Sequence, residues 1–153
     1  RLCGTREGII PSEELRRKFN EARGRLMGSP GLLGLVAMEA AFKYGDEWLE
    51  QVLGYIKGNI DYAMAYFRSK VPEIKPMNPE ATYLIWLDCR GLGLKPEELR
   101  SFFIEEARVG LNDGTAFGPE GEGYMRLNVG CPRSILEEGL TRIESAVRVR
   151  RKA

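Results

Sequence analysis

The sequence predicts an α/β fold, in which long connecting helices precede a small α+β lobe of order β-α-β-β-α. Three observations support this fold class. From residue 46 to about 71, apolar residues recur at intervals of three and four, the spacing of one helix face. Two runs, 82–87 and 124–129, contain the branched and aromatic residues typical of strands. Helix start signals stand at Pro96 and Ser134.

The first third of the chain is expected to be mainly helical. Residues 9–11 are predicted to end a short buried strand, after which Ser12 can cap a helix over roughly 12–25. A Gly-Ser-Pro-Gly break at 28–31 separates that helix from a second, mostly buried one that ends at Gly45.

The clearest helix of the sequence covers 46–71, with Asp46 as its expected N-cap. We interpret its apolar stripe as ordinary core packing. Gly54 and Gly58 lie inside it, and each should cost about 1 kcal/mol relative to alanine. They therefore either permit a close helix crossing or are tolerated because of tertiary packing.

The second half of the chain alternates strands and helices. A strand is predicted at 82–87 and a helix from Pro96, whose fixed φ suits the first helical turn. Further strands are predicted at 109–111 and 124–129, joined by the glycine-rich loop 112–123.

The last helix is predicted to start at Ser134, with Glu137 completing a capping box. Its expected buried stripe consists of Leu136, Leu140, Ile143 and Val147. The basic residues at its end, 148–152, are interpreted as a solvated helix terminus that complements the helix dipole, and not as a nucleic-acid-binding arm.

Composition excludes several classes of function. The 153 residues carry 23 basic and 22 acidic side chains, so no nucleic-acid-binding surface is indicated. Histidine is absent, which excludes serine or cysteine nucleophiles activated by histidine and metal sites built on it. Cys3, Cys89 and Cys131 form no Cys-x-x-Cys pair, and no run of 18 apolar residues occurs. We expect a cytoplasmic protein without a metal site or a membrane segment.

Arg126 is the strongest candidate for chemistry in the residues themselves. It alternates with apolar residues in a predicted strand, and a rigid guanidinium suits a bidentate grip on a carboxylate. The alternatives are an exposed arginine or one paired internally, for example with Glu122. The loop 112–123 is either a plain hairpin connection or a functional loop, in which Phe117 would need a reason to be near water.

Several motifs together resemble the class I/II aminotransferase family of pyridoxal-phosphate (PLP) enzymes of fold type I. They are Gly110-Leu111-Asn112, Phe117-Gly118, the stretch from Gly121-Glu122-Gly123 through Asn128, and Cys131-Pro132-Arg133-Ser134. The last motif, with segments 44–50 and 79–88, is similar to the cystathionine β-lyase-like C–S lyases. The resemblance covers nearly the whole chain.

The resemblance implies roles for individual residues. Arg126 would bind the α-carboxylate of an amino-acid substrate, and Phe117 and Gly118 would border the cofactor cleft. Arg6 would contact the phosphate of PLP. The Schiff-base lysine is expected about three residues before Arg1, so no lysine in this sequence is assigned as catalytic.

The resemblance also implies an architecture and an activity. Residues 1–45 would end the large PLP-binding domain, 46–71 would be the connecting helix, and 72–153 would form the C-terminal small domain. The whole protein would be a homodimeric C–S β-lyase or aminotransferase, and this part alone would be inactive. Arg6 follows the aminotransferase pattern, and Ala81 replaces a usual glycine. The alternative is a catalytically inactive module for oligomerisation or partner binding.

Overall fold

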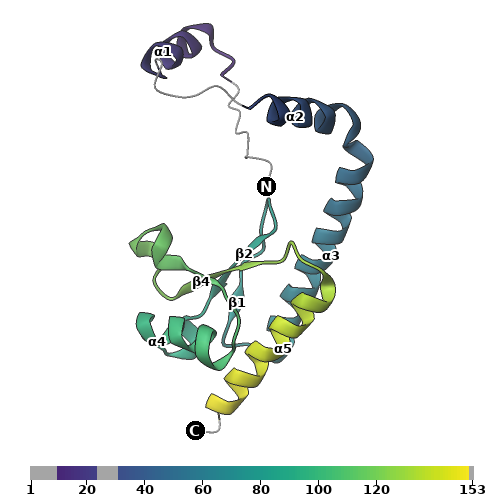
Figure 1. Ribbon diagram of the computed structural model, residues 1–153. Coiled ribbons are helices and arrows are strands. Elements are labelled where there is room, and N and C mark those ends of the chain that lie inside the picture. The colour runs from purple at the N-terminus through teal and green to yellow at the C-terminus, as the bar shows by residue number, and fades with distance from the viewer. Residues whose placement is uncertain (1–9, 24–30, 152–153) are drawn as a thin grey trace. The chain divides into compact units, whose positions relative to one another are not determined.

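The computed structural model describes residues 10–23 and 31–151 (Figure 1). The chain divides into two compact units, 1–51 and 52–153, which are described separately below. This division neither confirms nor replaces the three-part domain organisation expected above, which remains a prediction.

The first unit contains α1 (Glu13–Arg23), α2 (Leu32–Tyr44) and the start of α3 (Asp46–Lys70). The Ser12 hydroxyl accepts a hydrogen bond from the third residue beyond it, as a helix cap should. The prediction that the second helix is mostly buried is wrong for this chain: no residue of α2 is buried, and Phe42 is 83% exposed. No described part of the chain covers its apolar side chains. The strand expected to end at 9–11 lies largely outside the described residues.

The second unit is built on a four-stranded antiparallel sheet of order β1-β2-β4-β3. Its strands are β1 (Lys75–Pro76), β2 (Leu84–Asp88), β3 (Asn112–Asp113) and β4 (Tyr124–Asn128). β4 falls within the predicted run 124–129, whereas β2 overlaps the predicted run 82–87 and ends one residue later, at Asp88. The strand predicted at 109–111 is wrong, because the ladder beside β4 begins only at residue 112. The short β1 was not predicted, since a strand of two residues that includes a proline leaves no period-two pattern.

Two helical segments complete the lobe: one lies between β2 and β3 in the chain, and the other follows β4. α4 (Pro96–Ser101) starts at the predicted proline and continues as a π-helical stretch over Phe102–Glu106. α5 (Arg133–Arg150) starts one residue earlier than predicted. The capping box expected at Ser134 is wrong: the residue before the helix is Pro132, which has no side-chain donor or acceptor.

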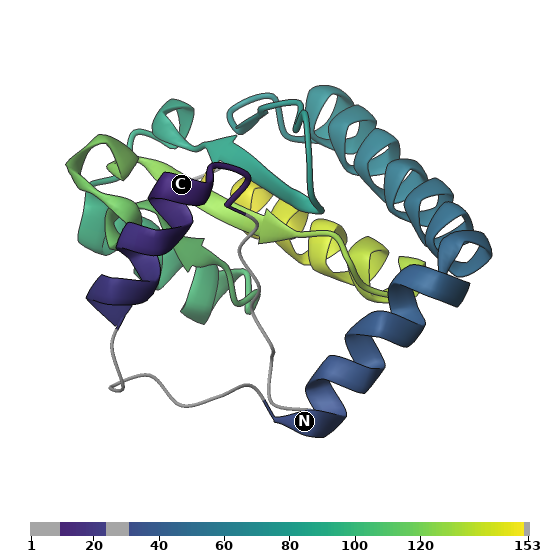
Figure 2. The same ribbon diagram turned by 90° about the horizontal axis from the view of Figure 1, so that it is seen from above.

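The core lies between one face of the sheet and the helices α3, α4 and α5 (Figures 1 and 2). The sheet contributes four buried side chains to it, namely Ile85, Leu87, Met125 and Leu127. The predicted stripe of α5 is buried at all four positions. The stripe of α3 is buried only in its second half, at Ala63, Met64 and Phe67, whereas Leu49 and Leu53 are exposed. The interpretation of that whole stripe as core was therefore only partly correct.

A buried amide fastens α3 to the chain that follows β4. Asn59 is fully buried and donates hydrogen bonds to the carbonyl oxygens of Val129 and Cys131, at 2.8 and 2.9 Å. Its own oxygen accepts one from Nε of Arg133 at 2.8 Å. Because buried polar groups are costly unless paired, these bonds fix where β4 ends relative to α3.

The two glycines inside α3 have different surroundings. A Cβ at Gly58 would lie 3.4 Å from Nη2 of Arg133, whose guanidinium also stacks on Tyr62. Gly54 has no atom within 4 Å of that position. Gly58 therefore lies where α3 approaches the start of α5, while Gly54 is simply tolerated.

Candidate functional site

Arg126 lies in the middle of β4, between the two neighbouring strands. It is directly opposite Trp86 on β2 and Asn112 on β3. Met125 and Leu127, which flank it, are buried in the core. Because alternate side chains of a strand point to opposite faces, Arg126 is on the sheet face away from the helices.

Two contacts hold the guanidinium of Arg126. Its Cζ lies 4.3 Å from the centroid of the Phe117 ring, an arrangement of cation over aromatic face. Its Nη2 donates a hydrogen bond to Oδ1 of Asn112 at 3.1 Å. Its Nε is buried and has no partner among the described residues. The residue as a whole is half-buried.

No described carboxylate pairs with Arg126. The acidic residue of β2 on the same face is Asp88, and it is bonded instead to Nε and Nη2 of Arg90, at 2.9 and 2.7 Å. That bidentate contact lowers the pKa of Asp88 below its usual value. Glu122 forms no ion pair among the described residues. The sequence left two alternatives for Arg126, an exposed side chain or an ion pair with a carboxylate such as Glu122. The half-buried residue without a described carboxylate partner agrees with neither.

The loop 112–123 folds back so that Phe117 reaches Arg126. Asp113 accepts hydrogen bonds from the amide and the hydroxyl of Thr115, at 2.9 and 2.8 Å, and so caps a short 3-10 helix that ends at Phe117. Gly114 and Gly121 pack backbone to backbone, where a Cβ on either would overlap a carbonyl oxygen of the other. The loop is therefore compact and is held by its own hydrogen bonds and backbone packing.

Phe117 contacts a second aromatic residue in the same place. Its ring meets that of Trp86 edge to face, with centroids 5.4 Å apart. Although Phe117 is 53% exposed, one side of its ring is covered by this contact and by the guanidinium. The next residue, Gly118, has a φ of +137°, a conformation that favours glycine and that turns the chain away after the ring.

Two of the predicted site residues are thus brought together, and two contributors were missed. Arg126 and Phe117 are in contact, with Gly118 adjacent in the chain, whereas Arg6 lies outside the described residues. Trp86 and Asn112 lie in segments that carry the resemblance, but the sequence analysis gave neither a role at the site. Their places beside Arg126 follow from strand register, which requires knowing that β4 lies between β2 and β3.

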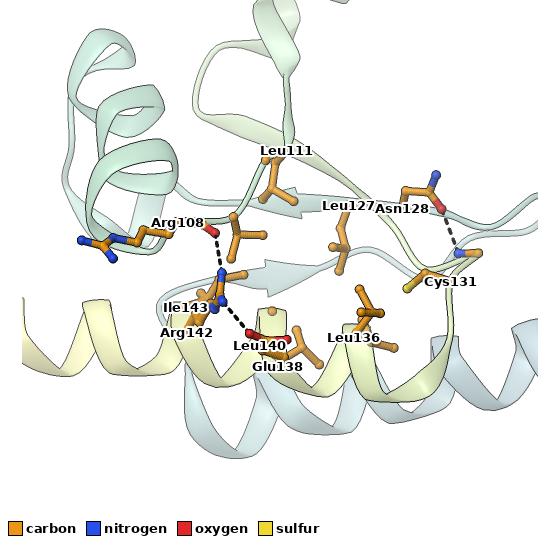
Figure 3. A pocket seen from close by; sticks show the side chains of 15 residues that line it. Arg108, Leu111, Leu127, Asn128, Cys131, Leu136, Glu138, Leu140, Arg142 and Ile143 are labelled. Carbon is orange, nitrogen blue, oxygen red and sulfur yellow. Dashed lines mark hydrogen bonds and ion pairs between the residues drawn. The ribbon is translucent and has the colours of Figure 1, made fainter.

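A separate cavity of about 410 Å³ lies on the other face of the sheet (Figure 3). It is lined by the segment 108–111, the chain after β4 and the first half of α5. Leu127 faces it, and the neighbouring Arg126 therefore points away from it. Burial raises the pKa of the Cys131 thiol in its wall, which disfavours the reactive thiolate. Of the predicted site residues that the structure describes, none lines this cavity.

Within ranges 10–23 and 31–151, no cluster of three acidic or cysteine side chains has the arrangement of a metal site. None of the helices in those ranges combines the length and apolar character needed to cross a bilayer.

The chain is similar to known proteins over most of its length. It is 40% identical over 140 residues to the cystathionine β-lyase PatB of Bacillus subtilis, and 38% identical over 143 residues to the protein MalY of Escherichia coli. These matches cover 91% and 92% of the chain, but only 36% and 37% of the relatives. The chain therefore spans a little over a third of their length. No protein-family model matches it.

A solved structure extends the likeness to three dimensions. Cystalysin from Treponema denticola, whose crystal structure contains a pyridoxal 5′-phosphate cofactor, superposes with a TM-score of 0.86 and 31% sequence identity. The match covers 92% of this chain and 36% of cystalysin.

Proposed function

This chain belongs to the cystathionine β-lyase-like group of the class I/II aminotransferase family, and from that premise we propose that it is the substrate-carboxylate lobe of a PLP-dependent enzyme. The reaction is C–S β-elimination or transamination of an amino acid. In it, Arg126 binds the α-carboxylate of the substrate. The observation that carries the proposal is the guanidinium itself, which is stacked, half-buried and without a carboxylate among the described residues.

The contribution of Arg126 is orientation. A guanidinium presents parallel N–H donors that match both oxygens of a carboxylate, so the amino acid is held in one pose. Holding the Cα–H bond in a fixed direction removes much of the entropic cost of reaching the transition state. Phe117 and Trp86 exclude water from one side of the charge and so strengthen the contact.

The cofactor would be held by other parts of the protein. The guanidinium of Arg126 suits a carboxylate, and the resemblance assigns the phosphate contact to Arg6 and the Schiff-base lysine to residues before Arg1. When bound, PLP serves as an electron sink that makes the Cα proton acidic. This chain alone is therefore expected to be inactive, and a polypeptide extended upstream through that lysine is expected to turn over substrate.

Replacement of Arg126 tests the proposal in the extended enzyme. Arg126→Ala should lower kcat/KM by about a hundredfold or more, because charged hydrogen bonds are worth about 1.5–3 kcal/mol each. Arg126→Lys should recover part of the loss, since it keeps the charge without the fork. Arg148→Ala, on the exposed end of α5, is the matched control. Near-normal kinetics for Arg126→Ala would remove the proposed role.

The alternative role is an inactive module for oligomerisation or partner binding. The exposed apolar side chains of α2 are the observation in its favour. An extended polypeptide that includes the lysine, binds PLP and still lacks turnover would favour it. A homodimer and a cytoplasmic location also remain predictions of the resemblance.

A further inference from the structure

Trp86, Arg126 and Asn112 form a row across three strands. The register pairs Trp86 with Arg126 and Arg126 with Asn112, so the three side chains share one face of the sheet. Phe117 lies over this row, in contact with both Trp86 and the guanidinium. Arg126 therefore has a neighbouring side chain on each adjacent strand and the ring of Phe117 above it.

Stacking on Phe117 restrains the guanidinium only in part. A cation over an aromatic face is attracted to the whole ring, so the contact holds the charge near Phe117 but does not by itself set the rotation of the guanidinium. The bond from Nη2 of Arg126 to Oδ1 of Asn112 removes that freedom. Nε is buried without a hydrogen-bond partner among the described residues, so Nη2 is the atom through which the described chain fixes the rotation of the guanidinium.

The charge of the acceptor matters as much as its position. An amide oxygen accepts a hydrogen bond without neutralising the guanidinium, whereas a carboxylate at the same place would form an ion pair. The neighbouring carboxylate, Asp113, is occupied by Thr115 and does not bond to Arg126. The sequence thus places a neutral acceptor beside Arg126 and turns the acidic one away.

We propose that Asn112 is a positioning residue, whose neutral amide sets the rotation of the Arg126 guanidinium for a substrate carboxylate while leaving its charge available. This inference rests on the proposed function. It predicts which substitution of Asn112 is the most harmful, and a purely structural role predicts a different order. Aspartate has nearly the shape of asparagine, so a structural role makes Asn112→Asp the mildest change. The proposal makes it the most harmful.

The kinetic test uses the extended PLP enzyme. Asn112→Asp should raise KM for the amino acid about tenfold or more, with kcat changed much less, because an internal ion pair competes with the substrate. Asn112→Ala should raise KM less. Ser134→Asp adds the same charge at an exposed position on α5, on the helical side of the sheet, and should leave KM within about twofold. An Asn112→Asp variant that is milder than Asn112→Ala would overturn the proposal.

A second readout needs neither PLP nor activity. In the 153-residue chain, the Nε–H resonance of Arg126 should shift in both Asn112 variants and stay in place in Ser134→Asp. An unmoved resonance would also overturn the positioning role. If this resonance shifts but Arg126→Ala leaves kcat/KM unchanged, the positioning stands and the carboxylate-binding function fails, so the two failures are distinguishable.

Discussion

Asp88 and Arg126 lie on the same face of the sheet, yet the carboxylate of Asp88 is bonded to Arg90 and not to Arg126. The register explains the separation, because Asp88 is opposite Tyr124 and Trp86 stands opposite Arg126. Arg90 in turn lies over the ring of Tyr124, 5.0 Å from its centroid. The local acidic charge is thus neutralised before it can compete for Arg126.

The Asp88–Arg90 pair should contribute to stability in a pH-dependent way. Arg90 lowers the pKa of Asp88, so the stabilisation is present above its ordinary value of 3.8 and is lost as pH falls through the lowered pKa. Arg90→Ala should therefore destabilise the chain at pH 6 and have little effect near pH 2. Denaturant unfolding at both values checks this, with Arg100→Ala on the exposed side of α4 as control. An Arg90→Ala effect that is equal at the two pH values would contradict it.

The loop that carries Phe117 should depend on Gly121. A Cβ there would lie 2.0 Å from the carbonyl oxygen of Gly114, so the backbone must move. We expect Gly121→Ala to lower the free energy of unfolding by about 1–3 kcal/mol, the usual cost of overpacking. Gly110→Ala is the matched control, because no atom lies within 4 Å of its Cβ position. Equal stabilities of the two variants in urea unfolding would show that the loop does not need this close approach.

The amide of Asn59 should be important for the end of β4. Asn59→Ala removes the donor to two backbone carbonyls and leaves Nε of Arg133 without its acceptor. Loss of buried hydrogen bonds should cost about 1–3 kcal/mol of unfolding free energy. Asn78→Ala, at an exposed position, should cost much less. If calorimetry gives the two variants the same melting temperature, the hydrogen bonds of Asn59 contribute nothing to stability.

Cys89 should make the chain sensitive to alkaline pH. Burial raises the pKa of its thiol from 9.0 to about 12. Because the folded-state pKa is the higher one, the neutral thiol stabilises the fold below pH 9, and that contribution is lost as pH rises toward 12. The stability difference between the wild-type chain and Cys89→Ala should shrink by up to about 1.4 kcal/mol per pH unit in this window. Urea unfolding between pH 8 and 10.5 measures it, and a constant difference would refute the prediction.

Local patterns were sufficient for the long elements of this chain. The stripe of α5 and the run that became β4 are each encoded by residues close together in sequence, so periodicity predicted them. The burial of α2 was mispredicted because an apolar pattern says that a surface is suited to burial, not that this chain supplies the covering layer. The two-residue strands carry too few residues for any period.

The site was only half predictable for the same physical reason. Arg126 and Phe117 attract attention as a charge in a strand and an aromatic in a loop. Trp86 and Asn112 become relevant only through pairing across strands, which joins positions 14 to 40 residues from Arg126. Such long-range register is set by the whole sheet, and no local signal in the sequence reports it.

A comparison of two ligands in the extended enzyme tests most sharply whether Arg126 binds the substrate carboxylate. For wild type, kcat/KM should be about a hundredfold or more higher for an amino acid with a free α-carboxylate than for its α-carboxamide, whose neutral group cannot pair with a guanidinium. In Arg126→Ala this preference should nearly vanish, which would locate the interaction between that side chain and the carboxylate. If Arg126→Ala keeps the full preference, another group binds the carboxylate, and Arg126 does not have the proposed role.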